Sequence, residues 1–104
     1  MNTFDIYIAY VSWGDGDKRR PVLILEEKTS STTVFSITTH YEDKSETIRA
    51  KFFAIIDWKQ AGLDRQSYID TNATVTLPLT AIDNPIGRLT TADEVRLIEF
   101  IDHQ

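Results

Sequence analysis

Two short segments hold the residues best suited to chemistry, Arg19-Arg20 and Thr38-Thr39-His40. Arginine stays charged at any working pH and presents a rigid fork of donors that suits phosphate or carboxylate. Histidine titrates near neutrality and can move protons, and threonine hydroxyls can hold an oxyanion. Gathered at one place, these groups could bind a phosphodiester and stabilise developing negative charge without a metal ion.

The two segments are expected to meet because each borders a predicted strand. Pro21 has no amide hydrogen and suits the beginning of a strand, which we place at residues 22–28. A short polar turn at 29–32 separates it from a strand at 33–38, and so tight a connection predicts an antiparallel hairpin. The start of one hairpin strand lies opposite the end of the other, so both segments should share one rim of the sheet.

Each of these residues also has a purely structural interpretation, which we favour when the residue is taken singly. Charged residues in loops usually only solvate the surface, threonine is common in strands, and a histidine at a strand end is usually exposed. The same holds for Lys44, Arg49 and Lys51, which would form a solvated cationic face. Other features of the chain must therefore decide between a site and a plain surface.

Three large aromatic residues, Trp13, Tyr41 and Trp58, could stack on unpaired bases, as in the recognition of single-stranded nucleic acid. In a small domain, large aromatic residues are more often part of the core. No glycine-rich phosphate loop, nucleophile elbow or zinc signature accompanies them.

The composition predicts one globular domain spanning residues 1–104, with 41% hydrophobic and 26% charged residues. The absence of cysteine and the presence of only two histidines, His40 and His103, exclude zinc fingers, thiol catalysis and multi-histidine metal sites. We therefore expect neither a metal ion nor another cofactor. The formal charge of −5 argues against broad attraction to duplex nucleic acid, and leaves room for a local basic groove.

A cytoplasmic location without membrane contact is the expectation from the same composition. The N-terminus lacks the basic segment and longer apolar stretch of a secretory signal, and the chain has no cysteine for disulfides. No apolar run approaches the roughly 20 residues that a membrane helix needs.

The rest of the chain predicts further short strands. They are expected at 5–11, 47–52, 68–70 and 74–79, with loops at 13–17 and 42–46, a turn at 83–85 and a break at Gly87. Residues 53–58 are apolar enough for the core and fit either a strand or the start of a short helix ending near Gly62. Pro78 suggests an edge strand or the end of a strand.

The last segment predicts a helix, with Thr91 as its N-cap and Glu94 as the capping-box partner. Its expected apolar face consists of Val95, Leu97, Ile98 and Ile101. Five or more short strands and these helical segments predict a mainly β, α+β fold, a small and partly closed β-barrel with a short helix and a C-terminal helix.

Several blocks of the sequence point to a known family when they are taken together. The most specific are Arg19-Arg20-Pro21-Val22-Leu23-Ile24-Leu25 and Ser36-Ile37-Thr38-Thr39-His40. The others are residues 5–11, the glycine-containing loop that follows them, 62–69 and 86–89. In this order the blocks resemble the MazF/PemK family of toxin endoribonucleases, and the resemblance spans nearly the whole chain.

The resemblance implies an SH3-like barrel that forms a homodimer and cleaves single-stranded RNA without metal, with the 2′-hydroxyl as nucleophile. It also implies inhibition by a paired antitoxin protein, through which any contact with DNA would be indirect. Carried onto this chain, the family's catalytic arginine and threonine are Arg20 and Thr38. The residues expected to bind substrate around them are Lys18, Arg19, Thr39, His40 and Arg49.

A second function remains open at this point. The chain could be a non-catalytic or inactive relative that binds an antitoxin peptide, or RNA, on the same cationic rim. The two functions differ in RNA turnover, which only the first predicts.

Overall fold

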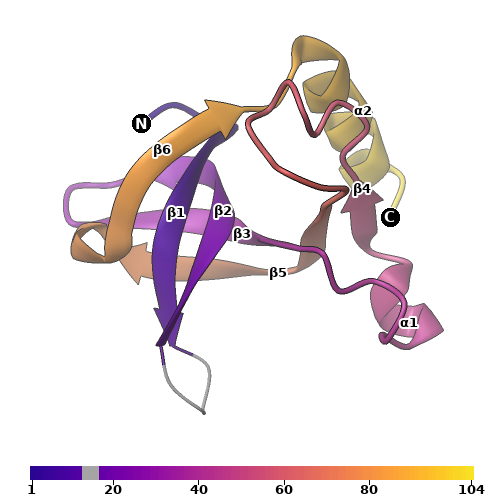
Figure 1. The fold of residues 1–104 in the computed structure, drawn as a ribbon, viewed down its shortest axis with the longest axis horizontal. Helices are drawn as coiled ribbons and strands as arrows, with labels where there is room; N and C mark the ends of the chain where they lie inside the picture. The colour runs from indigo at the N-terminus through magenta and orange to yellow at the C-terminus, as the bar shows by residue number, and fades with distance from the viewer. Residues whose placement is uncertain (13–16) are drawn as a thin grey trace.

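The computed structural model describes residues 1–12 and 17–104, in which six strands form one antiparallel sheet (Figure 1). The strands are β1 (Asp5–Ser12), β2 (Asp17–Glu27), β3 (Ser31–Thr38), β4 (Phe52–Ala54), β5 (Tyr68–Pro78) and β6 (Ile82–Arg88). Two α-helices, α1 (Glu46–Arg49) and α2 (Thr91–Asp102), and a 3-10 turn, η1 (Leu79–Ala81), complete the described elements. The predicted loop at 13–17, apart from residue 17 in β2, and the suggested stacking role of Trp13 lie outside the described residues.

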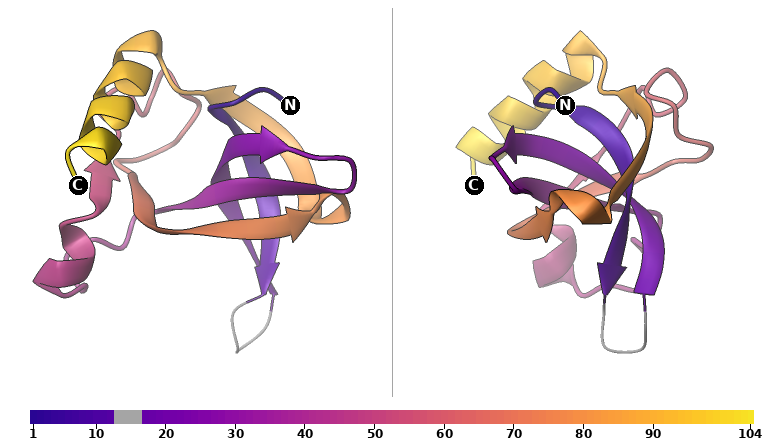
Figure 2. Two further views of the ribbon diagram at one scale, coloured as in Figure 1. Left: turned by 180° about the vertical axis from the view of Figure 1, so that it is seen from behind. Right: turned by 90° about the vertical axis from the view of Figure 1, so that its left-hand side faces the viewer.

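The sheet has the order β4-β5-β3-β2-β1-β6, and the described strands curl round without closing, because β4 and β6 stay at its two edges. The left view of Figure 2 shows α2 on the side of β4, away from the bend of β6. The expected mainly β, partly closed barrel with a short helix and a C-terminal helix is confirmed.

The β2–β3 hairpin is confirmed, with Val22 paired with Ser36 and Leu23 paired with Phe35. The predicted start of its first strand at residue 22 is wrong, because β2 begins at Asp17 and Pro21 lies inside it, opposite Ile8 of β1. Alternate residues of a strand face opposite sides of the sheet, so the hairpin contributes to two separate cores. On one side Leu23 and Phe35 join the first core cluster, which also contains Leu97 of α2. On the other side Val22 belongs to the second core cluster, which consists of Ala9, Val22, Ile24, Val34 and Leu77. Burial on both faces makes this hairpin the rigid centre of the sheet.

The strand predicted at 47–52 is wrong, because residues 46–49 form the short helix α1 and only Phe52 belongs to a strand, β4. Ser45 caps the helix, and its hydroxyl accepts the Ile48 amide at 3.3 Å. Glu46 in the first turn and Arg49 in the last turn also suit the helix dipole. These end signals outweigh a six-residue alternation.

No helix forms within residues 53–62, where β4 ends at Ala54 and a series of turns follows. Gly62 ends these turns with a left-handed φ of 95°. A Cβ atom on Gly62 would lie 2.0 Å from the carbonyl oxygen of Ile86, and one on Gly87 would lie 2.0 Å from that of Ala61. The two glycines therefore allow this loop and β6 to pack backbone against backbone.

The turn predicted at 83–85 and the break at Gly87 are wrong, because these residues belong to β6. The pairing of β6 with β1 shifts register on either side of Tyr7, which faces Pro85. An edge strand with such an irregularity tolerates a proline. The missing N–H of the proline costs little there, since an edge strand has no second neighbouring strand to bond.

The two strands predicted at 68–70 and 74–79 are one strand, β5, which ends at Pro78 as the proline suggested. Its pairing with β3 jumps from Val75 opposite Val34 to Asp70 opposite Ser36. Residues 71–74 therefore bulge out of the ladder, which explains why their sequence does not read as a continuous strand.

The terminal helix α2 is confirmed, but its N-cap is Thr90, whose hydroxyl accepts the Asp93 amide at 3.2 Å, and not Thr91. Its predicted apolar face is also wrong in part, because only Leu97 of that set is buried, whereas Val95 and Ile98 are 50% and 47% exposed. Phe100 packs edge-on against Phe53 in place of them. None of the helices in the described part of the chain has the length and apolarity needed to cross a membrane.

Candidate functional site

Arg20 and Thr38 come together at the open end of the β2–β3 hairpin. Extending the pairing of Val22 with Ser36 by two residues brings Arg20 opposite Thr38. Both residues line a pocket of about 290 Å³, here called the rim pocket. Its lining consists of Lys18, Arg20, Pro21, Ile37, Thr38, Thr39, His40 and Ser67.

Arg20 lies in β2 just beyond the residues of that strand that belong to the second core cluster. Arg20, Val22 and Ile24 alternate along β2 on one face, and the latter two are buried. Pro21, between the arginine and that buried pair, fixes its own φ and so restricts the backbone next to Arg20. Arg20 therefore starts from a backbone restrained by its neighbour, and the residue is half-buried.

Thr38 is held from the other side of the rim pocket. It pairs with Tyr68 of β5, and its hydroxyl accepts the backbone amide of His40 at 3.0 Å. A hydroxyl that accepts one hydrogen bond keeps its own hydrogen, which can be donated to a ligand oxygen. The same bond folds the chain after β3, so that Thr39 and His40 turn toward the pocket that Thr38 lines.

Arg19 lies on the opposite face of β2 and does not line the rim pocket. Its guanidinium donates to the Asp83 carboxylate at 2.8 Å and lies 5.7 Å from the centre of the Tyr10 ring. Residues next to each other in a strand point to opposite faces, which separates Arg19 from Arg20. The structure thus brings only the second arginine of the pair to the threonine.

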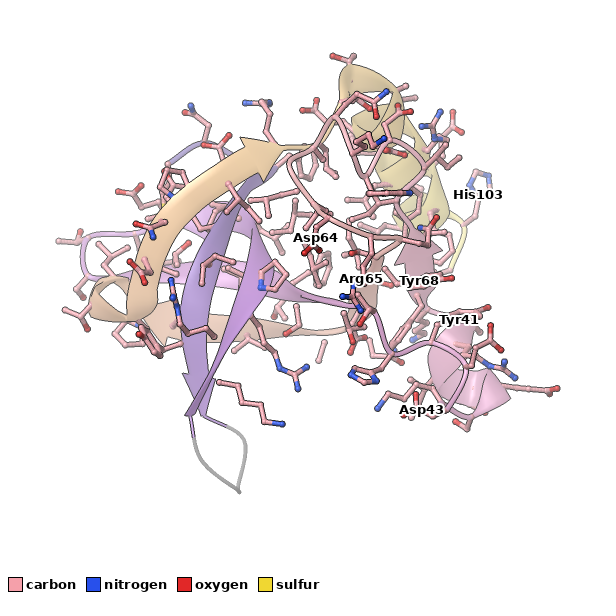
Figure 3. The ribbon with its side chains drawn as sticks, viewed as in Figure 1. Tyr41, Asp43, Asp64, Arg65, Tyr68 and His103 are labelled. Carbon is pink, nitrogen blue, oxygen red and sulfur yellow. The ribbon has the colours of Figure 1, made fainter. Side chains whose placement is uncertain are left out.

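Arg49 does not line the rim pocket either. It lies in the last turn of α1 and not in a strand of the hairpin. Its guanidinium lies 5.4 Å from the centre of the Tyr41 ring and 3.9 Å from a carboxylate oxygen of Glu42. Tyr41 in turn stacks on Tyr68 with ring centres 4.4 Å apart (Figure 3). Trp58, the remaining described aromatic residue proposed for stacking, packs against the first core cluster.

A second pocket of about 330 Å³ shares Arg20 and Thr38 with the rim pocket, and we call it the side pocket. Its other lining residues are Ser36, Lys44, Phe52 and Asp70. They belong to β3, β4, β5 and the turn before α1, so only the folded sheet brings them together.

The lining of the two pockets is mostly cationic or neutral. Among the described lining residues, Lys18, Arg20 and Lys44 carry positive charge, and Asp70 carries the one carboxylate. This local surplus contrasts with the formal charge of −5 for the whole chain. A phosphate group would therefore bind favourably at this site. A group attached to that phosphate would find both hydrogen-bond donors and the carboxylate acceptor of Asp70. Among the described residues no group of three or more histidine or acidic side chains is placed to hold a metal ion.

Sequence reasoning did not identify Ser36, Ser67 and Asp70 as lining residues. Strand alternation already puts Ser36 on the same face as Thr38, whereas Asp70 follows only from the pairing of residues 68–70 with 36–38, which is a long-range contact. By contrast, the separation of Arg19 from Arg20 follows from strand alternation alone, and could have been anticipated.

Comparison with known proteins gives matches among solved structures. The chain matches no family model and no curated protein. It is similar to a structure named Mycobacterium tuberculosis toxin MazF-mt6, with 29% identity, a TM-score of 0.73, and 95% of this chain and 93% of that chain covered. It is also similar to a structure named Mtb toxin, with 25% identity, a TM-score of 0.66, and coverage of 92% and 97%. These matches confirm the resemblance that the sequence blocks indicated.

Proposed function

We propose, because this chain is MazF-like in sequence and in fold, that it is the toxin of a toxin-antitoxin pair and a metal-independent endoribonuclease. Its substrate would be single-stranded RNA, cleaved by attack of a 2′-hydroxyl on the adjacent phosphodiester. The observation that carries the proposal is the placement of Arg20 and Thr38 opposite each other at a half-buried cationic rim.

The chemistry assigned to the site follows from the charges that develop. The 2′-oxygen forms a bond to phosphorus while the bond from phosphorus to the 5′-oxygen breaks, which yields a cyclic phosphate and a free 5′-hydroxyl. Negative charge on the non-bridging oxygens is greatest in between, and the Arg20 guanidinium would stabilise it there. The Thr38 hydroxyl would donate to one of these oxygens and hold the phosphate in place.

Protons must leave the 2′-hydroxyl and reach the 5′-oxygen during this reaction. His40 lines the rim pocket together with Arg20, and an imidazole can both accept and donate a proton. Lys18 and Thr39 would contact the flanking phosphate groups. Arg19 and Arg49, which lie away from the rim pocket, would contribute only to RNA that extends beyond it.

The partners and setting of the protein are part of the proposal. The protein would act as a single domain in the cytoplasm, form a homodimer and bind a cognate antitoxin protein, which alone would contact DNA.

The direct test is incubation of the purified protein with a long single-stranded RNA in the presence of EDTA. We expect cleavage by the wild type and no cleavage by Arg20→Ala, with the fold of the variant checked by circular dichroism. Lys28→Ala serves as the matched control, because it removes one exposed cation at the other end of the same strand region. Intact RNA with folded wild-type protein, or an Arg20→Ala variant as active as its parent, would contradict the proposal.

A non-catalytic function is the second candidate, and the formal charge of −5 favours it, since net negative charge weakens attraction to RNA. In this case the cationic rim would bind an antitoxin peptide. A tight peptide complex without RNA turnover would support this candidate, and cleavage on the same gel would exclude it.

A further inference from the structure

The side pocket lies where a nucleobase would go if a phosphate occupied the position between Arg20 and Thr38. The two pockets share these two residues, so a nucleotide bound at the rim pocket has the side pocket within reach of its own base or the next one. The volume of about 330 Å³ is at the lower end of the ~300–1,000 Å³ typical of ligand pockets. The pocket therefore suits one flat group and not a large ligand.

Asp70 is fixed in orientation at one wall of the side pocket. It pairs with Ser36 on one neighbouring strand and with Phe52 on the other. Its Oδ1 atom accepts two hydrogen bonds from Asn72, from the backbone amide at 2.9 Å and from the side-chain amide at 2.8 Å. Asn72 also donates to the Ile48 carbonyl at 3.1 Å, which connects this wall to α1. The Oδ2 atom keeps its capacity to accept from a ligand.

Phe52 provides a firm apolar wall beside this carboxylate. Its side chain is buried, with 7% exposed, and its ring centre lies 6.2 Å from that of Tyr41. Tyr41 is itself held by stacking on Tyr68. Aromatic walls of this kind favour flat, polarisable groups such as nucleobases.

Lys44 supplies the donor of the side pocket. Its backbone amide donates to the Tyr41 carbonyl at 3.2 Å, in the turn that leads from β3 to α1. The side chain is half-buried, and among the described residues its ammonium group makes no ion pair. A ligand oxygen or ring nitrogen that accepts a hydrogen bond would satisfy it.

We propose, on the basis of the proposed function, that the side pocket reads guanine beside the cleaved phosphate. Guanine presents two adjacent donors, N1–H and N2–H₂, which can share the Oδ2 atom of Asp70 that Asn72 leaves open, and the acceptors O6 and N7, which suit Lys44. Each of the other bases offers at most one donor group on that edge. A carboxylate therefore gains most from guanine, and Asp70 and Lys44 are specificity-determining residues of the site.

The first test maps the ends produced when each protein cleaves a random single-stranded RNA pool. We expect guanine to be enriched at one position next to the cut for the wild type. Asp70→Asn should lower this enrichment about tenfold, and Lys44→Met should lower it in the same direction, since a lost base contact costs that order of discrimination. The controls are Asp43→Asn and Lys28→Met, which make the same charge changes at exposed positions; Asp43 is labelled in Figure 3.

A second measurement separates this proposal from the proposed function. Uncleavable 2′-O-methyl oligonucleotides with guanine, inosine or adenine at the preferred position are titrated against each protein. Tighter binding of guanine than of inosine, lost in Asp70→Asn, would support the subsite even if no protein cleaved RNA. Cleavage without a guanine preference, or with a preference unchanged in Asp70→Asn, would overturn the subsite and leave the nuclease standing. Absence of both binding and cleavage would overturn both proposals.

Discussion

The carboxylate of Asp93 accepts the backbone amide of Asp57 at 2.8 Å, although the two residues are 36 positions apart in the sequence. The same carboxylate accepts the amide of Ile56 at 3.2 Å and the guanidinium of Arg96 at 2.8 Å. Asp93 is fully buried, with 0% of its surface exposed. It therefore joins α2 to the loop that follows β4, and that loop leads to Ser67 in the rim pocket.

Replacement of Asp93 should be costly because it leaves two partly buried backbone amides without an acceptor. We expect Asp93→Ala to lower the free energy of unfolding by about 3 kcal/mol. Urea denaturation followed by circular dichroism measures this change. Asp102→Ala, which removes an exposed carboxylate from the same helix, should change stability by less than about 0.5 kcal/mol. Equal effects of the two variants would show that the buried contact is unimportant.

The close approach of Gly62 and Gly87 predicts a second stability effect. An added Cβ at Gly87 would lie 2.0 Å from the Ala61 carbonyl oxygen, which is backbone and cannot rotate away. We expect Gly87→Ala to lower the unfolding free energy by at least about 2 kcal/mol, through separation of β6 from the loop. Thermal unfolding of this variant and of Ala73→Ser, at an exposed position in β5, provides the comparison. A Gly87→Ala protein with unchanged melting temperature would be inconsistent with this packing.

The role of the Thr38 hydroxyl can be tested separately from the role of the side-chain shape. Valine has the same outline without the hydroxyl, so Thr38→Val should lower the rate of RNA cleavage by one to two orders of magnitude, or about 1.4 to 2.7 kcal/mol in barrier height. Thr38→Ser should recover most of the activity, because it restores the donor. Thr74→Val, at an exposed position of β5, is the control. Full activity of Thr38→Val would remove this hydroxyl from the mechanism.

The cationic rim predicts a salt dependence for RNA binding. Each phosphate neutralised on a single strand contributes a slope of about −0.7 to log K against log salt. We expect Lys18→Met to make the measured slope shallower by about 0.7 and Lys28→Met to leave it unchanged, with fluorescence anisotropy of a labelled oligonucleotide as the readout. An unchanged slope in Lys18→Met would mean that Lys18 contacts no phosphate.

Local signals in the sequence account for much of this fold. The tight turn between two apolar runs predicted the β2–β3 hairpin, and Pro78 marked the end of β5. These features depend on residues close together in the chain, where backbone sterics and hydrogen bonding act directly. The rim that joins Arg20 to Thr38 followed from the same hairpin, whereas the resemblance to MazF toxins rested on blocks along nearly the whole chain.

The errors lie where competing local signals were of similar strength. Residues 47–52 alternate like a strand. Residues 46–49 nevertheless form a helix, which Ser45 caps and which has charges that suit the helix dipole at both ends. Residues 82–88 contain a proline and a glycine that favour a turn, yet they pair with β1 at the sheet edge. Helix capping settled the first case, and pairing with β1 settled the second.

The sequence by itself therefore determined a mainly β fold, from local strand patterns, and a candidate phosphate site, since Arg20 and Thr38 belong to one hairpin. Only the tertiary structure decided which side chains complete that site. It paired Arg19 with Asp83, and it brought Lys44, Phe52 and Asp70 to Arg20 and Thr38. Such contacts depend on the register of β5 and on the bulge at 71–74, because pairing between distant strands is fixed by the burial of the whole sheet.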